Sequence, residues 1–227
     1  MACEKIFADM KARGFTKIGM ISGSDGFGKS MQAQCKGVAE ASGVEIVADE
    51  VYGPQDADMT PQLTNIKGSG AEAILNSGMG QGPAVVTRHH TQLAIDAPLY
   101  QSHGVASKQF IELAGTEAAE GVRLPAAALL VADQLADDDA QKPVVQGYRD
   151  AYEAETGEDV STFGGHAYDA LYILKAAIEK AGSTEPAAIR DAIEQTTGFV
   201  GTGGEVNYTP EDHLGLTLDA FEMLEIK

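Results

Sequence analysis

Long apolar runs are missing from this sequence of 227 residues. No stretch approaches the roughly 20 consecutive apolar residues that a membrane-spanning helix needs. The opening residues, MACEKIFADMKARGF, follow the pattern of an amphipathic helix and not that of a signal peptide, in which a basic segment precedes an apolar one. With 44% hydrophobic and 22% charged residues, the composition is that of a globular protein with one large domain or two small ones.

Basic residues are scarce, because 16 Lys and Arg stand against 34 Asp and Glu, for a formal net charge of −18. A chain this acidic is repelled by nucleic acid and by anionic membrane surfaces, so nucleic acid is not an expected partner. The densest acidic run, at 137–139, is predicted to be a solvated loop. We find no metal-ligand pattern and no supported pair of nucleophile and base.

Cysteine occurs only twice, as Cys3 and Cys35, and their spacing matches no zinc or redox motif. One disulfide and two buried thiols are equally compatible with the composition.

Strand, turn and helix patterns alternate through the first 114 residues. Strands are predicted at 16–21, 45–52, 72–76 and 98–101, and helices at 2–13, 29–42, 83–93 and 106–114, with a short helix opening at Thr60. This alternation predicts an α/β fold with a parallel sheet and helices on both faces. In such sheets ligands bind at the turns that follow the strands, here 22–27, 53–58, 77–82 and 102–106.

The pattern changes near residue 125, which predicts a boundary between two packing units. An extended apolar segment is expected at 121–133, and a turn-rich stretch is expected to lead into a last strand at 216–226. Helices are predicted between them, at 142–156, 167–182 and 185–195.

Residues 23–30, GSDGFGKS, match the phosphate-binding loop pattern, in which Lys29 would reach the outer phosphates and Ser30 would hold magnesium. The alternative function is therefore a nucleotide-binding enzyme. Asp25 speaks against it, because its carboxylate would face the phosphate charge. No segment offers a clear catalytic switch for hydrolysis, and glycine-rich turns precede helices for conformational reasons alone.

Another interpretation covers nearly the whole chain. From Gly14 onward the sequence resembles the periplasmic solute-binding proteins of branched-chain amino acid type ABC transporters. The segments that carry the resemblance are GFTKIGMISGSDGFGKS, GVEIVADEVYGPQDADMTPQLTNIK, AEAILNSGMGQGPAVVTRHH, PLYQSHGVASKQFIELAG, EGVRLPAAALLVAD, GHAYDALYILKAAIEKAGS and GFVGTGGEVNYTPEDHLGL.

The resemblance implies a type 1 periplasmic-binding-protein fold, with one complete lobe and part of a second, and with the family's N-terminal part lacking. Residues 1–122 look like the second lobe, 123–205 like the helical remainder of the first, and 206–227 like the hinge return and final strand. The helices between 142 and 195 would then lack the sheet they normally cover, which would leave apolar faces exposed.

The same resemblance implies a periplasmic or extracytoplasmic receptor that is not an enzyme and uses no cofactor. It would bind a small amino acid or an aromatic or aliphatic carboxylate and deliver it to an ABC permease in the membrane. A ligand-sensing domain of a receptor or regulator with the same fold is an alternative.

Positions carried over from the family place nine residues at the ligand. These are Ser24, Asp25 and Phe27 after the first strand, Met79, Gly80 and Gln81 after the third, Ser102 and His103 after the fourth, and Tyr168 near the hinge. Phe27 stands where the family commonly has Tyr, so it would cover the ligand. The alternatives are structural: Phe27 packs under its loop, Gln81 is an exposed turn residue, and His103 bonds within its own turn.

At His103 the amino-acid binders of the family place a carboxylate that pairs with the ammonium group of the ligand. A histidine pairs better with an anionic or hydroxyl-bearing ligand, which favours a carboxylate over an amino acid. Because the family is exported, the resemblance also favours a disulfide between Cys3 and Cys35.

Overall fold

The computed structural model describes residues 1–227 and divides them into two compact units. The first unit comprises 1–125 and 223–227, and the second comprises 126–222. The chain therefore passes between the units twice, after Pro125 and after Glu222. No helix is both long enough and apolar enough to cross a membrane.

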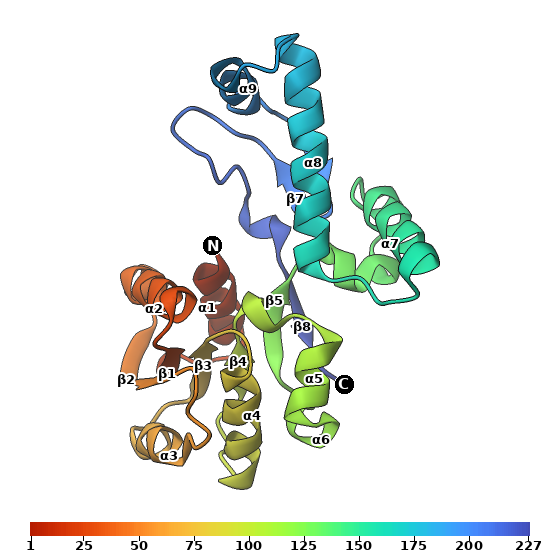
Figure 1. Ribbon diagram of the computed structural model, residues 1–227. Helices are drawn as coiled ribbons and strands as arrows, with labels where there is room; N and C mark the ends of the chain where they lie inside the picture. The colour runs from red at the N-terminus through yellow and green to blue at the C-terminus, as the bar shows by residue number, and fades with distance from the viewer. The chain divides into compact units, whose positions relative to one another are not determined.

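A mainly parallel sheet forms the centre of the first unit, with the strand order β2-β1-β3-β4-β5-β8 (Figure 1). The strands are β1 (Lys17–Gly23), β2 (Glu45–Tyr52), β3 (Ala73–Ser77), β4 (Leu99–Gln101), β5 (Arg123–Ala126) and β8 (Glu222–Glu225). Buried residues run almost without break through β1 and β3, as is typical of strands that are covered on both faces. The predicted α/β fold with a parallel sheet is confirmed.

Helices cover both faces of this sheet. On one face Ile18 and Met20 pack in a core with Phe7 of α1 (Ala2–Ala12) and Met31 of α2 (Gly26–Ala39). On the other face a Cβ atom at Gly19 would overlap Ile66 of α3 (Thr60–Gly68), so α3 lies directly against β1. The remaining helices of this unit are α4 (Gly82–Gln92), η1 (His103–Val105), α5 (Lys108–Ala114) and α6 (Thr116–Ala119).

A disulfide joins Cys3 of α1 to Cys35 of α2, with the two Cα atoms 5.1 Å apart. Both residues are almost fully buried in the core under the same face of the sheet. Of the two possibilities that the composition leaves open, the structure has the bonded one.

The second unit is mainly helical (Figure 1). Its elements are η2 (Ala128–Gln134), α7 (Lys142–Thr156), α8 (Thr162–Ala181), α9 (Pro186–Ile193), the antiparallel hairpin β6 (Phe199–Gly201) and β7 (Gly204–Val206), and η3 (Leu218–Ala220). Leu129 and Ala132 of η2 pack with Val145 and Tyr148 of α7 in a small core.

Two helices begin earlier than the sequence predicts, because polar caps extend them. Asp25 accepts a hydrogen bond from the N–H of Gly28 at 2.9 Å, so α2 begins at Gly26 and not at residue 29. Ser161 accepts from the N–H of Gly164 at 3.2 Å, so α8 begins at Thr162 and not at residue 167. Both first turns contain glycines, whose helix propensity is low, so propensity alone does not predict these helix starts.

Two segments predicted to be extended are helical in part. Residues 128–134 form η2, which consists of two short 3₁₀ turns with the non-helical Val131 between them, and Leu129 and Ala132 face the same core. A short apolar run fits a strand and a buried helix equally well, which explains the error. Similarly, η3 interrupts the expected strand at 216–226, and only Glu222–Glu225 joins the sheet.

Candidate ligand-binding edge of the first unit

Three loops follow neighbouring strands of the first unit and therefore lie at one edge of its sheet. Strands β1, β3 and β4 are adjacent and parallel, so their carboxyl ends point the same way. From β1 the chain goes to β2 on one side, then to β3 and β4 on the other, so the winding direction reverses between β1 and β3. Ligands of open α/β sheets bind at such a reversal point.

The loop after β1 is short, with only Ser24 and Asp25 between the strand and α2. The carboxylate of Asp25 accepts a hydrogen bond from the N–H of Gly28. The turn is also tight, because a Cβ atom at Gly28 would overlap the carbonyl group of Gly23. A phosphate-binding loop is a wide turn whose backbone N–H groups are free to bind the phosphates, whereas this turn is tight and closed. The geometry therefore disfavours the nucleotide-binding alternative.

The loop after β3 projects its predicted residues into solvent. Met79, Gly80 and Gln81 are exposed, while Gly78 before them and Gly82 after them are buried. Gly80 has φ +72°, a left-handed conformation that glycine adopts without strain. These side chains are accessible to a ligand, and the exposure of Gln81 is equally compatible with the structural alternative.

The loop after β4 is joined to both other loops. The hydroxyl of Ser102 donates to the carbonyl oxygen of Gly78 at 2.6 Å and accepts from the N–H of Gly104 at 3.2 Å. The rings of Phe27 and His103 meet edge to face with centroids 5.4 Å apart. The structure thus gathers Phe27, Ser102 and His103 at one edge, although they are far apart in the sequence.

Chemically this edge suits binding better than catalysis. It offers half-buried aromatic rings, the hydroxyl of Ser24 and exposed loop backbone, whereas the carboxylate of Asp25 already caps a helix. A small molecule with a polar end and an apolar body fits such a surface.

Tyr168 belongs to the second unit, where it stands in a row of aromatic rings. Its centroid lies 4.8 Å from that of Tyr148 and 4.5 Å from that of Tyr172. A hydrogen bond with Tyr172, together with burial, raises the pKa of Tyr168 to about 12. These contacts give Tyr168 a packing role within its own unit, and its predicted role at the ligand stays a prediction.

A buried polar network under the loops escaped the sequence analysis. Tyr52, Asn76, Gln101 and Thr87 are all buried, and hydrogen bonds connect them. A signal was present, since Asn76 and Gln101 are polar residues at or next to the carboxyl ends of two mostly apolar strands.

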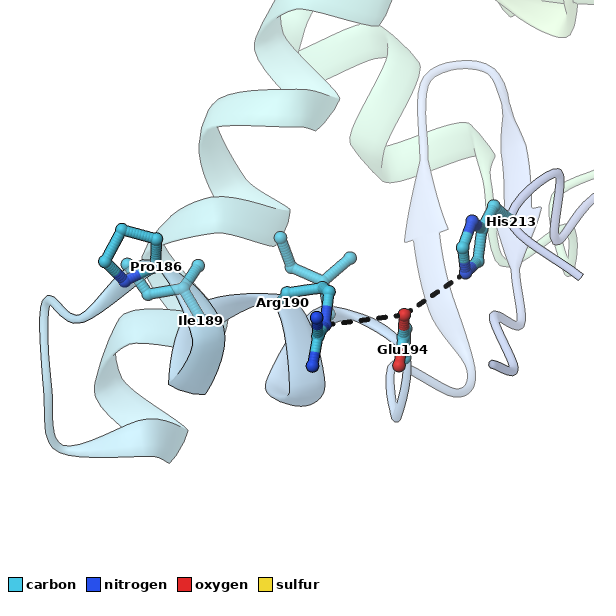
Figure 2. A pocket seen from close by; sticks show the side chains of 6 residues that line it. Pro186, Ile189, Arg190, Glu194 and His213 are labelled. Atoms are coloured by element: carbon cyan, nitrogen blue, oxygen red, sulfur yellow. Dashed lines mark ion pairs between the residues drawn. The ribbon is translucent and has the colours of Figure 1, made fainter. Parts of the chain in front are cut away.

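The second unit holds an apolar pocket of about 370 Å³, with Pro186, Ile189 and Ile193 in its lining (Figure 2). Its polar groups contact one another, because Glu194 lies 3.3 Å from the ring of His213 and 3.9 Å from the guanidinium group of Arg190. None of the predicted ligand residues lines this pocket, so it does not compete with the sheet edge as the predicted site.

Comparison with known proteins points to one family. The family model described as periplasmic binding protein matches residues 2–220. The Leu/Ile/Val-binding protein BraC3 of Rhizobium johnstonii is 26% identical over 197 residues, which are 85% of this chain and 50% of that protein. The leucine-, isoleucine-, valine-, threonine-, and alanine-binding protein of Pseudomonas aeruginosa is 24% identical over 78% of this chain and 45% of that protein. The chain thus spans about half the length of the curated relatives it matches.

Solved structures agree with this result. Rp1789 of Rhodopseudomonas palustris superposes with a TM-score of 0.92 and 26% identity, over all of this chain and 67% of that one. An extracellular ligand-binding receptor from R. palustris HaA2 has a TM-score of 0.90 and 28% identity, over all of this chain and 64% of that one. A type 1 periplasmic binding protein from Bordetella pertussis has a TM-score of 0.82 and 25% identity, over 99% of this chain and 62% of that one.

Proposed function

The chain belongs to the periplasmic binding protein family, and we propose that it forms the solute-binding part of an extracytoplasmic receptor that serves an ABC importer. In this proposal it binds a small molecule, catalyses no reaction, needs no cofactor and hands its ligand to a membrane permease. The observation that carries the proposal is the meeting of three loops at the reversal point of the sheet. Relatives named for binding leucine, isoleucine and valine support a ligand of that size.

Within this size range the proposed ligand is a carboxylate with an apolar or aromatic body. A carboxylate is the usual partner of an ammonium group in a binding site, and the loops at 78–81 and 102–106 contain no acidic side chain. The carboxylate of Asp25 accepts from the N–H of Gly28 through Oδ1 and so caps α2. Phe27 and His103 provide an aromatic contact and a hydrogen-bonding ring instead.

Matched pairs of ligands test this function. We would record ¹⁵N–¹H spectra of the labelled protein with L-leucine and with 4-methylpentanoate, which lacks only the amino group, and likewise with L-phenylalanine and 3-phenylpropanoate. Saturable shifts of the amide signals at 24–27, 79–81 and 102–104 are expected with the carboxylates, and weaker shifts with the amino acids.

His103→Ala should weaken these shifts, and His213→Ala serves as the control because His213 lies on the second unit with an exposed side chain. Stronger shifts with the amino acids would overturn the carboxylate assignment but keep the receptor. No saturable shift at these loops with any of the four compounds would count against the receptor itself.

A further inference from the structure

Tyr52, the last residue of β2, fills the space between the ends of the loop that follows β3. Its ring is almost fully buried. A Cβ atom at Gly78 would overlap the Tyr52 hydroxyl, and a Cβ atom at Gly82 would overlap the edge of the ring. Both ends of the loop 78–82 therefore rest on one side chain, and glycine at these two positions is what allows so close an approach.

Hydrogen bonds link Tyr52 to residues on both sides of this loop. The Tyr52 hydroxyl donates to Asn76 Oδ1 at 3.2 Å, and Asn76 Nδ2 donates to Gln101 Oε1 at 2.8 Å. Gln101 Nε2 in turn donates to the carbonyl oxygen of Pro83 at 3.3 Å and to the hydroxyl of Thr87 at 2.9 Å. The chain of bonds starts before the loop, at Asn76, and ends after it, in the first turns of α4.

The backbone of the same residue also bonds to the loop after β1. The backbone N–H of Ser24 donates to the carbonyl oxygen of Tyr52 at 2.8 Å. Burial raises the pKa of Tyr52, so its hydroxyl stays protonated and donates throughout the physiological range.

We propose that Tyr52 is the positioning residue of the ligand-binding edge, which fixes the loops after β1 and β3 relative to each other without touching the ligand itself. For its biological meaning the inference rests on the proposed function. Its structural content does not, because the position of the loop can be measured without any ligand.

Methionine methyl groups provide that measurement. Met79 lies exposed in the loop 78–82, whereas Met10, Met20 and Met31 are buried in the core that α1 and α2 form with the sheet. In ¹H–¹³C spectra of protein labelled at the methionine methyl groups, Met79→Leu would assign the loop signal. The buried three then report whether the core is intact.

Tyr52→Leu is expected to move the Met79 signal toward its position in the unfolded chain, while the signals of Met10, Met20 and Met31 stay in place. Tyr52→Phe keeps the ring and loses only the bond to Asn76, so it should give a smaller shift of the same kind. Gly82→Ala should perturb Met79 as well, and combining it with Tyr52→Leu should restore much of the native shift, because the smaller side chain makes room for the new methyl group.

An unmoved Met79 signal in Tyr52→Leu with an intact core would overturn the inference. If Tyr52→Leu does not fold, Tyr52→Phe decides in its place: an unmoved Met79 signal overturns the inference, and a shifted one supports it. A shifted Met79 signal in a protein that binds none of the four test ligands would keep the positioning role and count against the proposed receptor alone.

Discussion

Thr202 donates two hydrogen bonds to the buried carboxylate of Asp169, one from its backbone N–H at 2.8 Å and one from its hydroxyl at 3.0 Å. The N–H of Gly203 adds a third bond at 2.9 Å. Asp169 lies on α8, and Thr202 and Gly203 form the turn of the β6–β7 hairpin. One side chain thereby fastens the hairpin to the helix.

Asp169→Asn is expected to lower the free energy of unfolding by about 1.5–3 kcal/mol, because an amide nitrogen cannot accept from the N–H groups that face it. Urea unfolding at neutral pH measures the loss. Asp138→Asn, in the exposed acidic run, is the control and should change stability by less than about 0.5 kcal/mol. Equal stability of both variants would mean that the hairpin does not depend on this carboxylate.

A second carboxylate, that of Asp9, makes stability depend on pH. Arg123 donates to Asp9 from Nε at 3.0 Å and from Nη2 at 2.9 Å, and the hydroxyl of Tyr100 donates at 2.7 Å. Burial works to raise the pKa of Asp9, but the bonds from Arg123 and Tyr100 and the charge of Arg123 together hold it below its ordinary value. Arg123 also pairs with Glu225, so α1, β5 and β8 meet at one guanidinium group.

Because the pKa of Asp9 is lower in the folded state, the stability it contributes is present above the unfolded-state value near 4 and is lost as the pH falls through the folded-state value. We therefore expect Asp9→Asn to cost about 1.5–3 kcal/mol at pH 7 and progressively less below pH ~4. Urea unfolding across this range tests the sign, with the exposed Glu40→Gln as the control. A cost that stays constant down to pH ~2 would contradict the ion-pair assignment.

Two serines at the ligand edge should respond differently to the same substitution. Ser102 bonds to Gly78 and Gly104, whereas the hydroxyl of Ser77, equally buried, has no hydrogen-bond partner in the protein. Ser102→Ala should destabilise by about 1–2 kcal/mol, since it leaves buried backbone groups unpaired, while Ser77→Ala should be neutral or slightly stabilising. Thermal unfolding of the two variants side by side gives the comparison, and a similar loss for both would refute it.

The disulfide should contribute strongly to the stability of the first unit. Cys3 and Cys35 are 32 residues apart, and a loop of that length corresponds to about 3–4 kcal/mol in the chain-entropy description. Unfolding by urea with and without a reductant measures it, and the double variant Cys3→Ala, Cys35→Ala should match the reduced protein. Mass spectrometry of non-reduced protein must find the two linked. Two freely alkylated thiols would contradict the assignment.

The hydrophobic pattern of the sequence was enough to predict the fold. Strands such as β1 and β3 are short, mostly apolar runs between turn residues, and they can be recognised without knowing what they pack against. It failed where a local cap overrides propensity, as Asp25 and Ser161 do at the starts of α2 and α8. It also failed at η2, where a short apolar run that fits a strand forms two 3₁₀ turns on either side of Val131.

The ligand edge was partly predictable for a similar reason. The turns after parallel strands must meet, so the grouping of Ser102 and His103 with Phe27 follows from strand order. The role of Tyr52 could not be foreseen, because it depends on the space between two glycines that are 26 and 30 residues further along the chain. Only the packed structure shows beside which of the many glycines a given ring lies.

Helix α8 carries an apolar stripe that the second unit leaves uncovered. Leu171 is 67% exposed, Phe163 57% and Leu174 40%. Together with exposed alanines they follow the spacing of one helix face, at positions 163, 167, 170, 171 and 174. Apolar faces were expected in this region, and a contiguous exposed stripe of this kind promotes association between molecules.

Leu171→Lys should therefore reduce concentration-dependent association of the chain while leaving its thermal unfolding nearly unchanged, because the leucine makes few contacts that the lysine would lose. Sedimentation velocity over a series of concentrations measures the association. Leu113→Lys is the matched control, since Leu113 is 42% exposed on α5 of the first unit and has no such stripe around it. If both variants associate like the unsubstituted chain, the stripe is not what brings molecules together. If both reduce association equally, the effect is not specific to the α8 face, and net charge does not explain it, because each lysine brings the charge of −18 closer to zero.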